Sequence, residues 1–148
     1  MDIESILAPE HTYCKVRASS KKRVIENIAI QLAETIKGLD AEEIFTNLIN
    51  REKIGSTAIG HGIAIPHCRL DNCNEITCAL FTLDTAIDFR AMDDEEVGIL
   101  FVLLVPTAET QKHLEVLATL AGKFESETYR KQLASAKDNN ELYLRAIS

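Results

Sequence analysis

The chain has 148 residues, of which 46% are hydrophobic and 26% are charged, and its formal net charge is −7 at pH 7. This composition is typical of a globular protein, and we expect one domain over residues 1–148 with its own hydrophobic core. An acidic chain repels the phosphate backbone of nucleic acids, so we expect no nucleic-acid binding as the main activity.

The apolar stretches are too short to predict a membrane span. The longest one, residues 97–105, has nine residues, whereas a transmembrane helix needs about 20. The acidic start of the chain lacks the basic residues and the apolar core of a signal peptide. We therefore expect a cytoplasmic protein without membrane insertion.

The first third of the chain predicts a strand followed by two helices. A short helical lead-in over residues 3–7 precedes a loosely alternating stretch, residues 12–16, which predicts an edge strand. Apolar residues at helical spacing then predict a helix that Ser19 or Ser20 caps and Gly38 ends. Asp40 and Glu43 resemble the capping box of a second helix, which runs to about Glu52.

The middle of the chain predicts three strands. Residues 63–65 read as a short strand that Pro66 stops, and residues 75–83 as a longer one. The continuous apolar run over residues 98–105 predicts a central strand buried on both faces.

The last third predicts three helices. The first has Thr107 as its N-cap and carries apolar residues at helical spacing, namely Leu114, Leu117, Leu120, Ala121 and Phe124. Two shorter helices follow over residues 126–136 and 139–147. Helices before, between and after strands indicate an α/β fold with a helical layer over a mostly buried sheet, in which the strand order stays open.

His67 is the strongest candidate for chemistry. It follows a short strand and Pro66, whose fixed φ makes the strand end stiff, and α/β folds commonly bind ligands at strand ends. A neutral imidazole is a competent nucleophile near neutral pH. The alternative is a turn residue with a satisfied hydrogen bond, and the residues alone leave these two interpretations about equal.

The segment before His67 predicts a site for a phosphoryl group. Gly55, Gly60 and Gly62 allow tight turns and close approach of the backbone, and such turns can form an anion-binding concavity. We expect the phosphate to contact this loop through Ser56, Thr57, Gly60, His61 and Gly62.

Two further residues are candidates for contacts to the phosphate. His113 shares a helix face with Leu117, Leu120 and Phe124, and we expect its ring to meet His67 across the sheet; a partly buried helix histidine without a function is the alternative. Arg51 ends the second helix, where its guanidinium suits two phosphoryl oxygens, although such an arginine is more often a partner of the helix dipole.

Residues 51–67, which end in Gly-Ile-Ala-Ile-Pro-His, resemble the mannitol/fructose-type (type 2) EIIA domain of the bacterial phosphotransferase system. The later stretch, residues 103–114, resembles the second conserved block of that family. The resemblance implies a single-domain α/β sandwich with a mixed central β-sheet flanked by helices. It also implies that His67 accepts a phosphoryl group from an HPr-type phosphocarrier protein, with help from His113 and Arg51. It implies no cofactor and no metal.

Within that family, the chain most resembles the nitrogen-related regulatory branch. The sequence ends at Ser148 without an attached EIIB or membrane EIIC domain, which sugar-transporting versions often carry. Members of the nitrogen-related branch are regulators whose phosphorylation state decides which target proteins they bind. The alternative is a sugar-specific, fructose- or mannitol-type EIIA that passes phosphate to a separate EIIB.

The sequence departs from the family at three positions. His61 stands where asparagine is usual, and Ala58 and Cys68 stand where glycine or another small residue is usual. A charge on His61 would depend on pH. Oxidation of Cys68, directly after His67, is a further hypothesis for interference with phosphorylation.

Four cysteines raise the question of a metal or a disulfide. Cys68, Cys73 and Cys78 lack the two-residue spacing of zinc knuckles, so we expect buried or half-buried apolar side chains. A metal-binding module that uses His61, His67 and Cys68 is the alternative from another functional class, but it leaves the glycine pattern unexplained.

Overall fold

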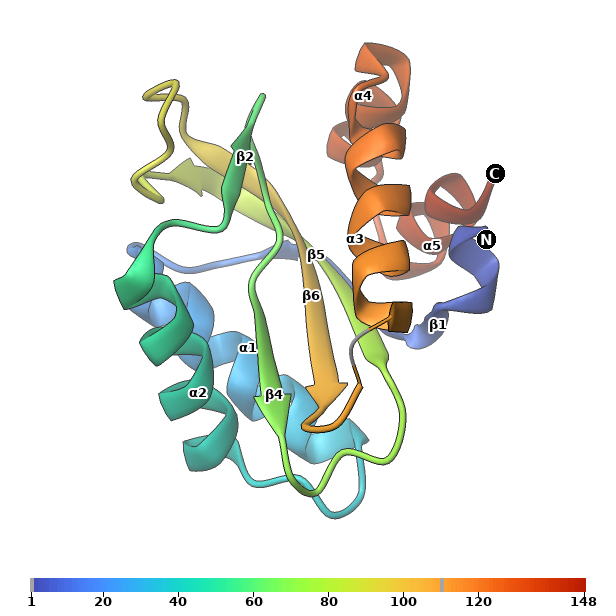
Figure 1. Ribbon diagram of the computed structural model, residues 1–148. Helices are drawn as coiled ribbons and strands as arrows, with labels where there is room; N and C mark the ends of the chain where they lie inside the picture. Colours follow the sequence, from blue (N-terminus) through green and yellow to red (C-terminus); the bar gives the residue numbers. More distant parts are fainter. Residues whose placement is uncertain (1, 110) are drawn as a thin grey trace.

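The computed structural model describes residues 2–109 and 111–148, and its elements form three layers (Figure 1). A six-stranded sheet lies in the middle. Helices α1 (Lys21–Thr35) and α2 (Ala41–Ile54) cover one face. Helices α3 (Gln111–Phe124), α4 (Glu127–Ser135) and α5 (Asn139–Ile147) cover the other. The predicted α/β sandwich is confirmed.

The sheet is mixed and is built around one central strand. Its strands are β1 (Leu7–Val16), β2 (Ala58–Gly60), β3 (Ile63–Ala64), β4 (His67–Leu70), β5 (Thr77–Ile87) and β6 (Val97–Pro106), with a 3-10 helix (Ile3–Ser5) before β1. The order is β1-β5-β6-β3-β2, and β4 also pairs with β6. Strand β6 is antiparallel to β5 but parallel to β3 and β4, and β1 is parallel to β5.

Strand β6 explains why the sheet needs helices on both faces. Its side chains alternate between two cores: Leu100, Val102 and Leu104 pack toward α1 and α2, whereas Phe101 and Leu103 pack toward the C-terminal helices. A strand buried on both faces carries apolar residues at every position. The predicted central strand is therefore confirmed.

The first two helices begin where the sequence predicts. The Ser20 side chain accepts a hydrogen bond from the Arg23 amide, and the Asp40 side chain accepts one from the Glu43 amide. Helix α1 ends at Thr35, a few residues before Gly38, and α2 continues past Glu52 to Ile54. Strand β1 lies at the sheet edge as predicted, but it begins at Leu7 and is longer than expected.

The prediction that Thr107 caps the next helix is wrong. Helix α3 begins at Gln111, and the Glu109 carboxylate accepts a hydrogen bond from the Lys112 amide near its start. The Thr107 hydroxyl instead donates to Asp71 Oδ1 at 2.7 Å. A cap acts on the amides two or three residues after it, so Thr107 lies too far from the helix to serve.

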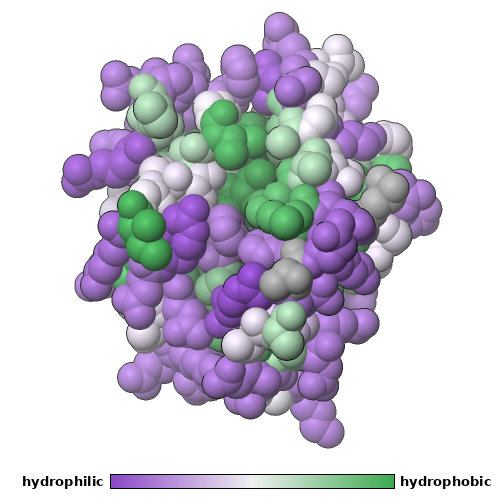
Figure 2. Space-filling model, in the orientation of Figure 1, coloured by the Kyte–Doolittle hydropathy of each residue, from purple (hydrophilic) through white to green (hydrophobic). Residues whose placement is uncertain are grey.

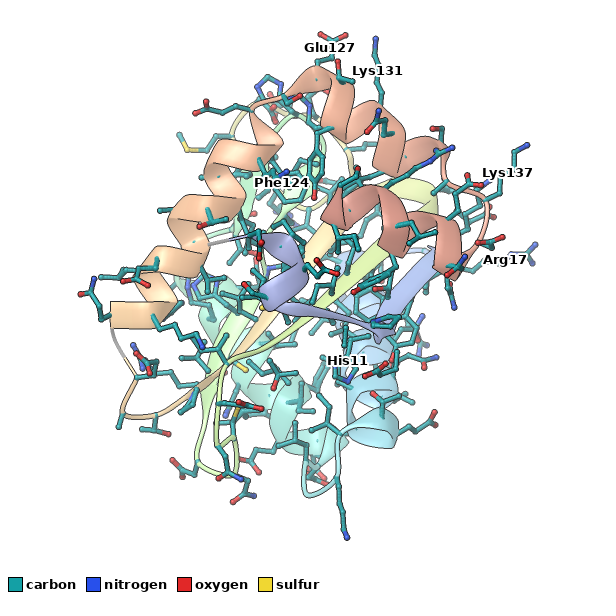
Figure 3. The ribbon with its side chains drawn as sticks, turned by 90° about the vertical axis from the view of Figure 1, so that its right-hand side faces the viewer. His11, Arg17, Phe124, Glu127, Lys131 and Lys137 are labelled. Atoms are coloured by element: carbon teal, nitrogen blue, oxygen red, sulfur yellow. The ribbon has the colours of Figure 1, made fainter. Side chains whose placement is uncertain are left out.

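The buried face of α3 differs from the predicted one at three positions. Val116, Leu120 and Phe124 are buried at four-residue spacing, whereas Leu114 is 62% exposed and Ala121 is also exposed. Figure 3 shows charged side chains of the following helical region, such as Glu127 and Lys131, pointing outward. None of the helices in the described part of the chain is both long and apolar enough to cross a bilayer.

Pro66 interrupts the sheet without ending it. Strand β3 lies before Pro66 and the unpredicted strand β4 lies after it, and both are parallel to β6. Proline lacks an N–H and so costs one donor of the ladder, but its carbonyl still accepts from the Leu103 amide at 2.9 Å. His67 therefore begins a second strand segment instead of following the end of the sheet.

Candidate functional site

A cleft of about 480 Å³ lies between α2, β4 and the start of α3. It contains three of the predicted site residues, His67, His113 and Arg51, together with Asn47, Asn50, Ile54, Cys68 and Arg69. Figure 2 shows the face on which these elements lie in front, where apolar side chains gather in the centre among hydrophilic ones. The structure thus brings the predicted acceptor and both predicted helpers together.

The hydrogen bond of His67 determines which ring nitrogen is available. Nδ1 lies 2.7 Å from the carbonyl oxygen of Ile65, two residues earlier across Pro66. A carbonyl can only accept, so Nδ1 carries the proton and Nε2 of the neutral ring keeps its lone pair. The half-buried ring is therefore oriented with Nε2 as the nucleophilic atom.

The ring of His113 lies against that of His67. The two ring centroids are 5.4 Å apart and the planes meet at 68°. Within the described residues, His113 Nε2 is a buried polar atom that has no hydrogen-bond partner. Because buried polar groups are almost always paired, this atom marks a place where a bound group is expected.

The position of Arg51 agrees with both interpretations from the sequence, a partner of the helix end and a side chain that faces the site. Its Nη1 donates to the carbonyl oxygen of Gly55 at 2.8 Å, and Gly55 is the C-cap of α2. The guanidinium also lines the cleft, and its charge contributes to lowering the pKa of His67. Arg51 thus stabilises a helix end and places a positive charge beside the histidine.

Burial keeps both histidines neutral at pH 7. For His67, removal from water lowers the pKa below 6.5 more strongly than the Ile65 carbonyl raises it, and Arg51 and Arg69 lower it further against Glu52. For His113, burial again comes first, followed by the charges of His67 and Arg69, with Glu109 opposing. A neutral His67 is the form that attacks phosphorus.

We expect the ring protons of His67 to titrate with a midpoint below 6.5 in an NMR pH series, and at the ordinary histidine value in the urea-unfolded chain. Since the unfolded state then binds the proton more readily, the free energy of unfolding falls as the pH is lowered below 6.5. Stability that rises on acidification through this range, with a midpoint above 6.5, would contradict the burial of the ring.

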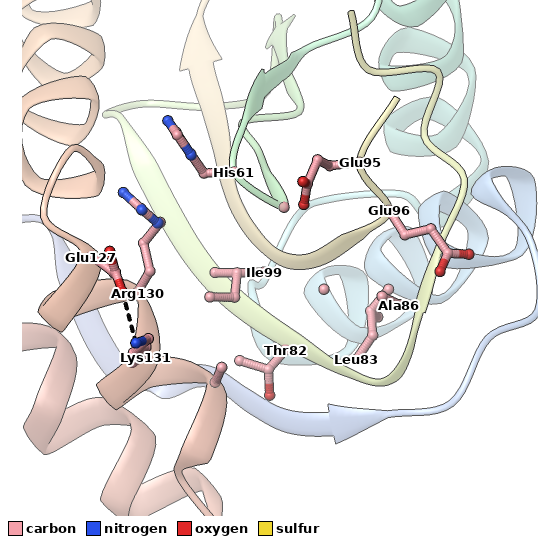
Figure 4. A pocket seen from close by; sticks show the side chains of 13 residues that line it. His61, Thr82, Leu83, Ala86, Glu95, Glu96, Ile99, Glu127, Arg130 and Lys131 are labelled. Atoms are coloured by element: carbon pink, nitrogen blue, oxygen red, sulfur yellow. Dashed lines mark ion pairs between the residues drawn. The ribbon is translucent and has the colours of Figure 1, made fainter. Parts of the chain in front are cut away.

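The glycine-rich turn does not lie in this cleft. Ile63 is in register with Ile99 and His67 with Leu103, so about 13 Å of β6 separate the turn from His67. His61 lines another cleft, and Figure 4 shows its side chain there with Glu95 and Arg130. This arrangement does not support a direct phosphate contact from Gly60, His61 or Gly62.

A structural need explains the pattern of the turn. Gly60, His61 and Gly62 have φ of 95°, 57° and 80°, in the left-handed region that glycine adopts freely and asparagine or histidine tolerate best. The His61 amide donates to Asp93 Oδ2 at 3.0 Å. Asparagine, which is usual at this position in the family that the sequence resembles, and the histidine here both suit this conformation.

The hydroxyls of Ser56 and Thr57, which were predicted to contact the phosphate, form hydrogen bonds outside the cleft. Ser56 Oγ donates to the Phe89 carbonyl oxygen at 2.8 Å. Thr57 is buried, its amide donates to Glu52 Oε1 at 3.1 Å, and its hydroxyl bonds to the same carboxylate. Neither residue lines the cleft around His67, so both hold the segment in place instead of binding a ligand there.

Cys68, Cys73 and Cys78 are buried, and Cys14 is half-buried. Cys68 is 7% exposed, and burial raises the pKa of its thiol to about 12, so little reactive thiolate forms at neutral pH. The hypothesis of oxidation beside His67 loses support. Within residues 2–109 and 111–148, no group of three or more histidine, cysteine or acidic side chains is placed to hold a metal ion.

Four residues that line the cleft were not predicted from the sequence, namely Arg69, Asn47, Asn50 and Ile54. Asn47 and Ile54 share a helix face with Arg51 at spacings of four and three, so helical periodicity could have identified them. Arg69 follows His67 by two residues and shares its strand face, but that signal depends on the unpredicted strand β4.

Residues 5–146 match the model of a protein family described as "Phosphoenolpyruvate-dependent sugar phosphotransferase system, EIIA 2". A relative named nitrogen regulatory protein, from Pseudomonas aeruginosa, is 46% identical over 141 residues, which cover 95% of this chain and 92% of the relative.

Two solved structures extend the comparison. The crystal structure of the nitrogen regulatory protein IIA-Ntr from Neisseria meningitidis is similar with a TM-score of 0.89 and 37% identity, over 98% of this chain and 97% of that one. The mannitol enzyme IIA of Escherichia coli, solved in complex with phosphorylated enzyme IIB, has a TM-score of 0.79 at 19% identity, over 95% of this chain and 96% of that one. The second likeness concerns the fold alone.

Proposed function

The chain belongs to the EIIA 2 family of the phosphoenolpyruvate-dependent sugar phosphotransferase system, and we propose that it is a cytoplasmic regulatory phosphocarrier that accepts a phosphoryl group on His67. The donor is an HPr-type carrier protein, residues 1–148 act as one EIIA domain, and no cofactor takes part. The phosphorylated and unphosphorylated forms then bind different target proteins.

The transfer requires a nucleophile and a place for the transferred charge. The lone pair of His67 Nε2 attacks the phosphorus of the donor's phosphohistidine, and a P–N bond forms as the donor's P–N bond breaks. The donor nitrogen recovers its electron pair, so the step needs no other reactant. The Ile65 carbonyl oxygen still accepts from Nδ1–H and stabilises the positive charge that develops on the ring.

The unpaired Nε2 of His113 is the observation that carries this proposal. It is buried beside the ring of His67 and has no hydrogen-bond partner among the residues that the structure describes. A phosphoryl oxygen on His67 would give it a hydrogen-bond acceptor and remove the penalty of an unsatisfied buried group, about 1–3 kcal/mol. Arg51 and Arg69, in the same cleft, add the positive charge that offsets the phosphoryl group.

The names of the relatives support a regulatory output. The Pseudomonas aeruginosa and Neisseria meningitidis proteins are both named nitrogen regulatory proteins. The alternative is a sugar-specific EIIA that passes phosphate to an EIIB, as the Escherichia coli mannitol complex exemplifies on the same fold. Rapid transfer from the phosphorylated chain to a fructose- or mannitol-type EIIB would favour this alternative.

Incubation with a ³²P-labelled phosphorylated HPr-type carrier tests the proposal. We expect label to move to the chain and to return to unlabelled carrier when it is added in excess, because a phosphohistidine is a reversible store. No transfer of label under conditions in which the carrier phosphorylates a known EIIA would contradict the proposed function.

Replacing His113 is expected to slow uptake without abolishing it. His113→Ala removes one donor to the transferred group, and a loss of this kind slows a reaction by about 100-fold. His113→Gln, whose amide can donate from a similar position, is expected to recover part of the rate. Quenched time courses of label uptake give the rates of both variants. A wild-type rate in His113→Ala would exclude a phosphate contact from this residue.

A further inference from the structure

One arginine connects strand β4 to the loop that precedes α3. Arg69 Nη1 donates to the carbonyl oxygens of Pro106 at 3.3 Å, of Thr107 at 3.0 Å, and of Glu109. A single guanidinium thus contacts three carbonyls of one loop. That loop leads into the first turn of α3, which carries His113.

Further hydrogen bonds carry this connection on to the helix. The Glu109 amide donates to the Pro106 carbonyl oxygen at 3.0 Å, and the Glu109 carboxylate accepts from the Lys112 amide at 3.0 Å. The Thr107 hydroxyl donates to Asp71, just after β4, at 2.7 Å. A continuous set of bonds therefore runs from β4 to the residue next to His113.

The backbone of Arg69 is itself held from both sides. It is in register with Val105 of β6, and its carbonyl oxygen accepts from Asn47 Nδ2 of α2 at 3.0 Å. Because side chains two residues apart lie on one face of a strand, Arg69 projects on the same side of β4 as His67. The arginine is a fixed point from which the loop is tied.

The charge of Arg69 also acts on the site. Among the described residues it forms no ion pair, and it lowers the pKa of both His67 and His113. The other charged or titratable groups that act on His113 are His67 and Glu109, and on His67 they are Arg51 and Glu52. Arg69 therefore acts in two ways: its charge lowers the pKa of the two histidines, and its hydrogen bonds hold the loop.

We propose that Arg69 is a positioning residue, which holds His113 against His67 by tying the loop of residues 106–109 to strand β4. This inference rests on the proposed function of His67. These hydrogen bonds fix the position of His113 before the donor protein binds, so the transfer step does not have to supply the free energy of ordering it. Displacements of about 1 Å in such a site lower the rate by up to about 100-fold.

Two substitutions separate the tie from the charge. Arg69→Lys keeps the charge, but its side chain is one bond shorter and lacks the planar guanidinium, whereas Arg69→Gln loses both. Arg23→Gln is the matched control, because Arg23 lies on α1 in an exposed ion pair with Glu26. Thr107→Val removes the bond to Asp71 and leaves Arg69 unchanged.

The measurements are the rate of phosphoryl uptake from an HPr-type donor, amide hydrogen exchange over residues 111–116, and the NMR titration of His113. We expect both Arg69 variants to slow uptake by about 10- to 100-fold and to exchange faster over residues 111–116. The pKa of His113 should rise in Arg69→Gln but stay near the wild-type value in Arg69→Lys. Thr107→Val should show the same exchange effect, though smaller, and Arg23→Gln none.

Other patterns overturn the inference. If Arg69→Lys takes up phosphate at the wild-type rate and Arg69→Gln takes it up slowly, only the charge of Arg69 acts. The same conclusion follows if both variants take up phosphate slowly but amide exchange at the start of α3 is unchanged. Wild-type behaviour of both variants excludes any role. If the wild-type chain itself takes up no phosphate, the proposed function fails, and the exchange data still decide whether Arg69 ties the loop.

Discussion

Replacement of His67 by alanine is expected to reduce phosphoryl uptake by more than about 1,000-fold, as removal of a catalytic nucleophile does in other enzymes. The reason is the hydrogen bond of the ring: Nδ1–H donates to the Ile65 carbonyl, which leaves the lone pair of the neutral ring on Nε2. His113 does not substitute for it, because its Nε2 is buried. The assay is the initial rate of label transfer from a phosphorylated HPr-type carrier.

His11→Ala is the matched control for this experiment. His11 is also a half-buried histidine whose pKa is lowered by burial, but it lies on β1 beside another cleft. We expect it to keep the wild-type rate. Equal losses in the two variants, or label retained by His67→Ala, would remove His67 from its assigned role.

Replacement of Glu52 by alanine is expected to lower the free energy of unfolding by about 3 kcal/mol. The Glu52 side chain is 4% exposed and lies 2.9 Å from Lys21 Nζ, whose side chain is 22% exposed. It also accepts from the amide and hydroxyl of Thr57. Its loss leaves the half-buried Lys21 ammonium without its counter-ion, although the Phe89 carbonyl oxygen still accepts from it at 3.4 Å, and it leaves the buried Thr57 amide without its acceptor. Together these losses cost more than the ion pair contributes.

Glu26→Ala provides the comparison, because Glu26 pairs with Arg23 on the surface of α1, where such pairs contribute about 0–1 kcal/mol. Urea unfolding of both variants gives the two free energies. Glu52→Gln should lie between them, since it keeps an acceptor for the Thr57 amide. A Glu52→Ala variant as stable as Glu26→Ala would mean that the network contributes nothing.

Local patterns predicted the long elements of the fold. Strand β6 was recognisable because every residue of a doubly buried strand is apolar, and α1 because its buried residues recur at helical spacing and Ser20 caps its start. Strand order was not predictable, because the pairing of β1 with β5 joins segments far apart in the chain.

Two features of the site depend on tertiary contacts that no single residue predicts. Pro66 suggested the end of a strand, although only one amide of the ladder is lost there, so β4 and with it Arg69 were missed. The glycines near His67 suggested a ligand loop, whereas Gly60 and Gly62 serve a left-handed turn that lies elsewhere. Proximity in sequence did not reveal which cleft a residue faces.

The position of the phosphoryl group on the phosphorylated chain tests the central claim most directly. NMR of the ¹⁵N-labelled chain after phosphorylation by an HPr-type carrier reports both the residue and the ring nitrogen that carries phosphorus. We predict a single phosphohistidine, with the phosphorus on Nε2 of His67 and Nδ1 still protonated toward the Ile65 carbonyl. Phosphorus on Nδ1 of His67, or on any other residue, would contradict the account.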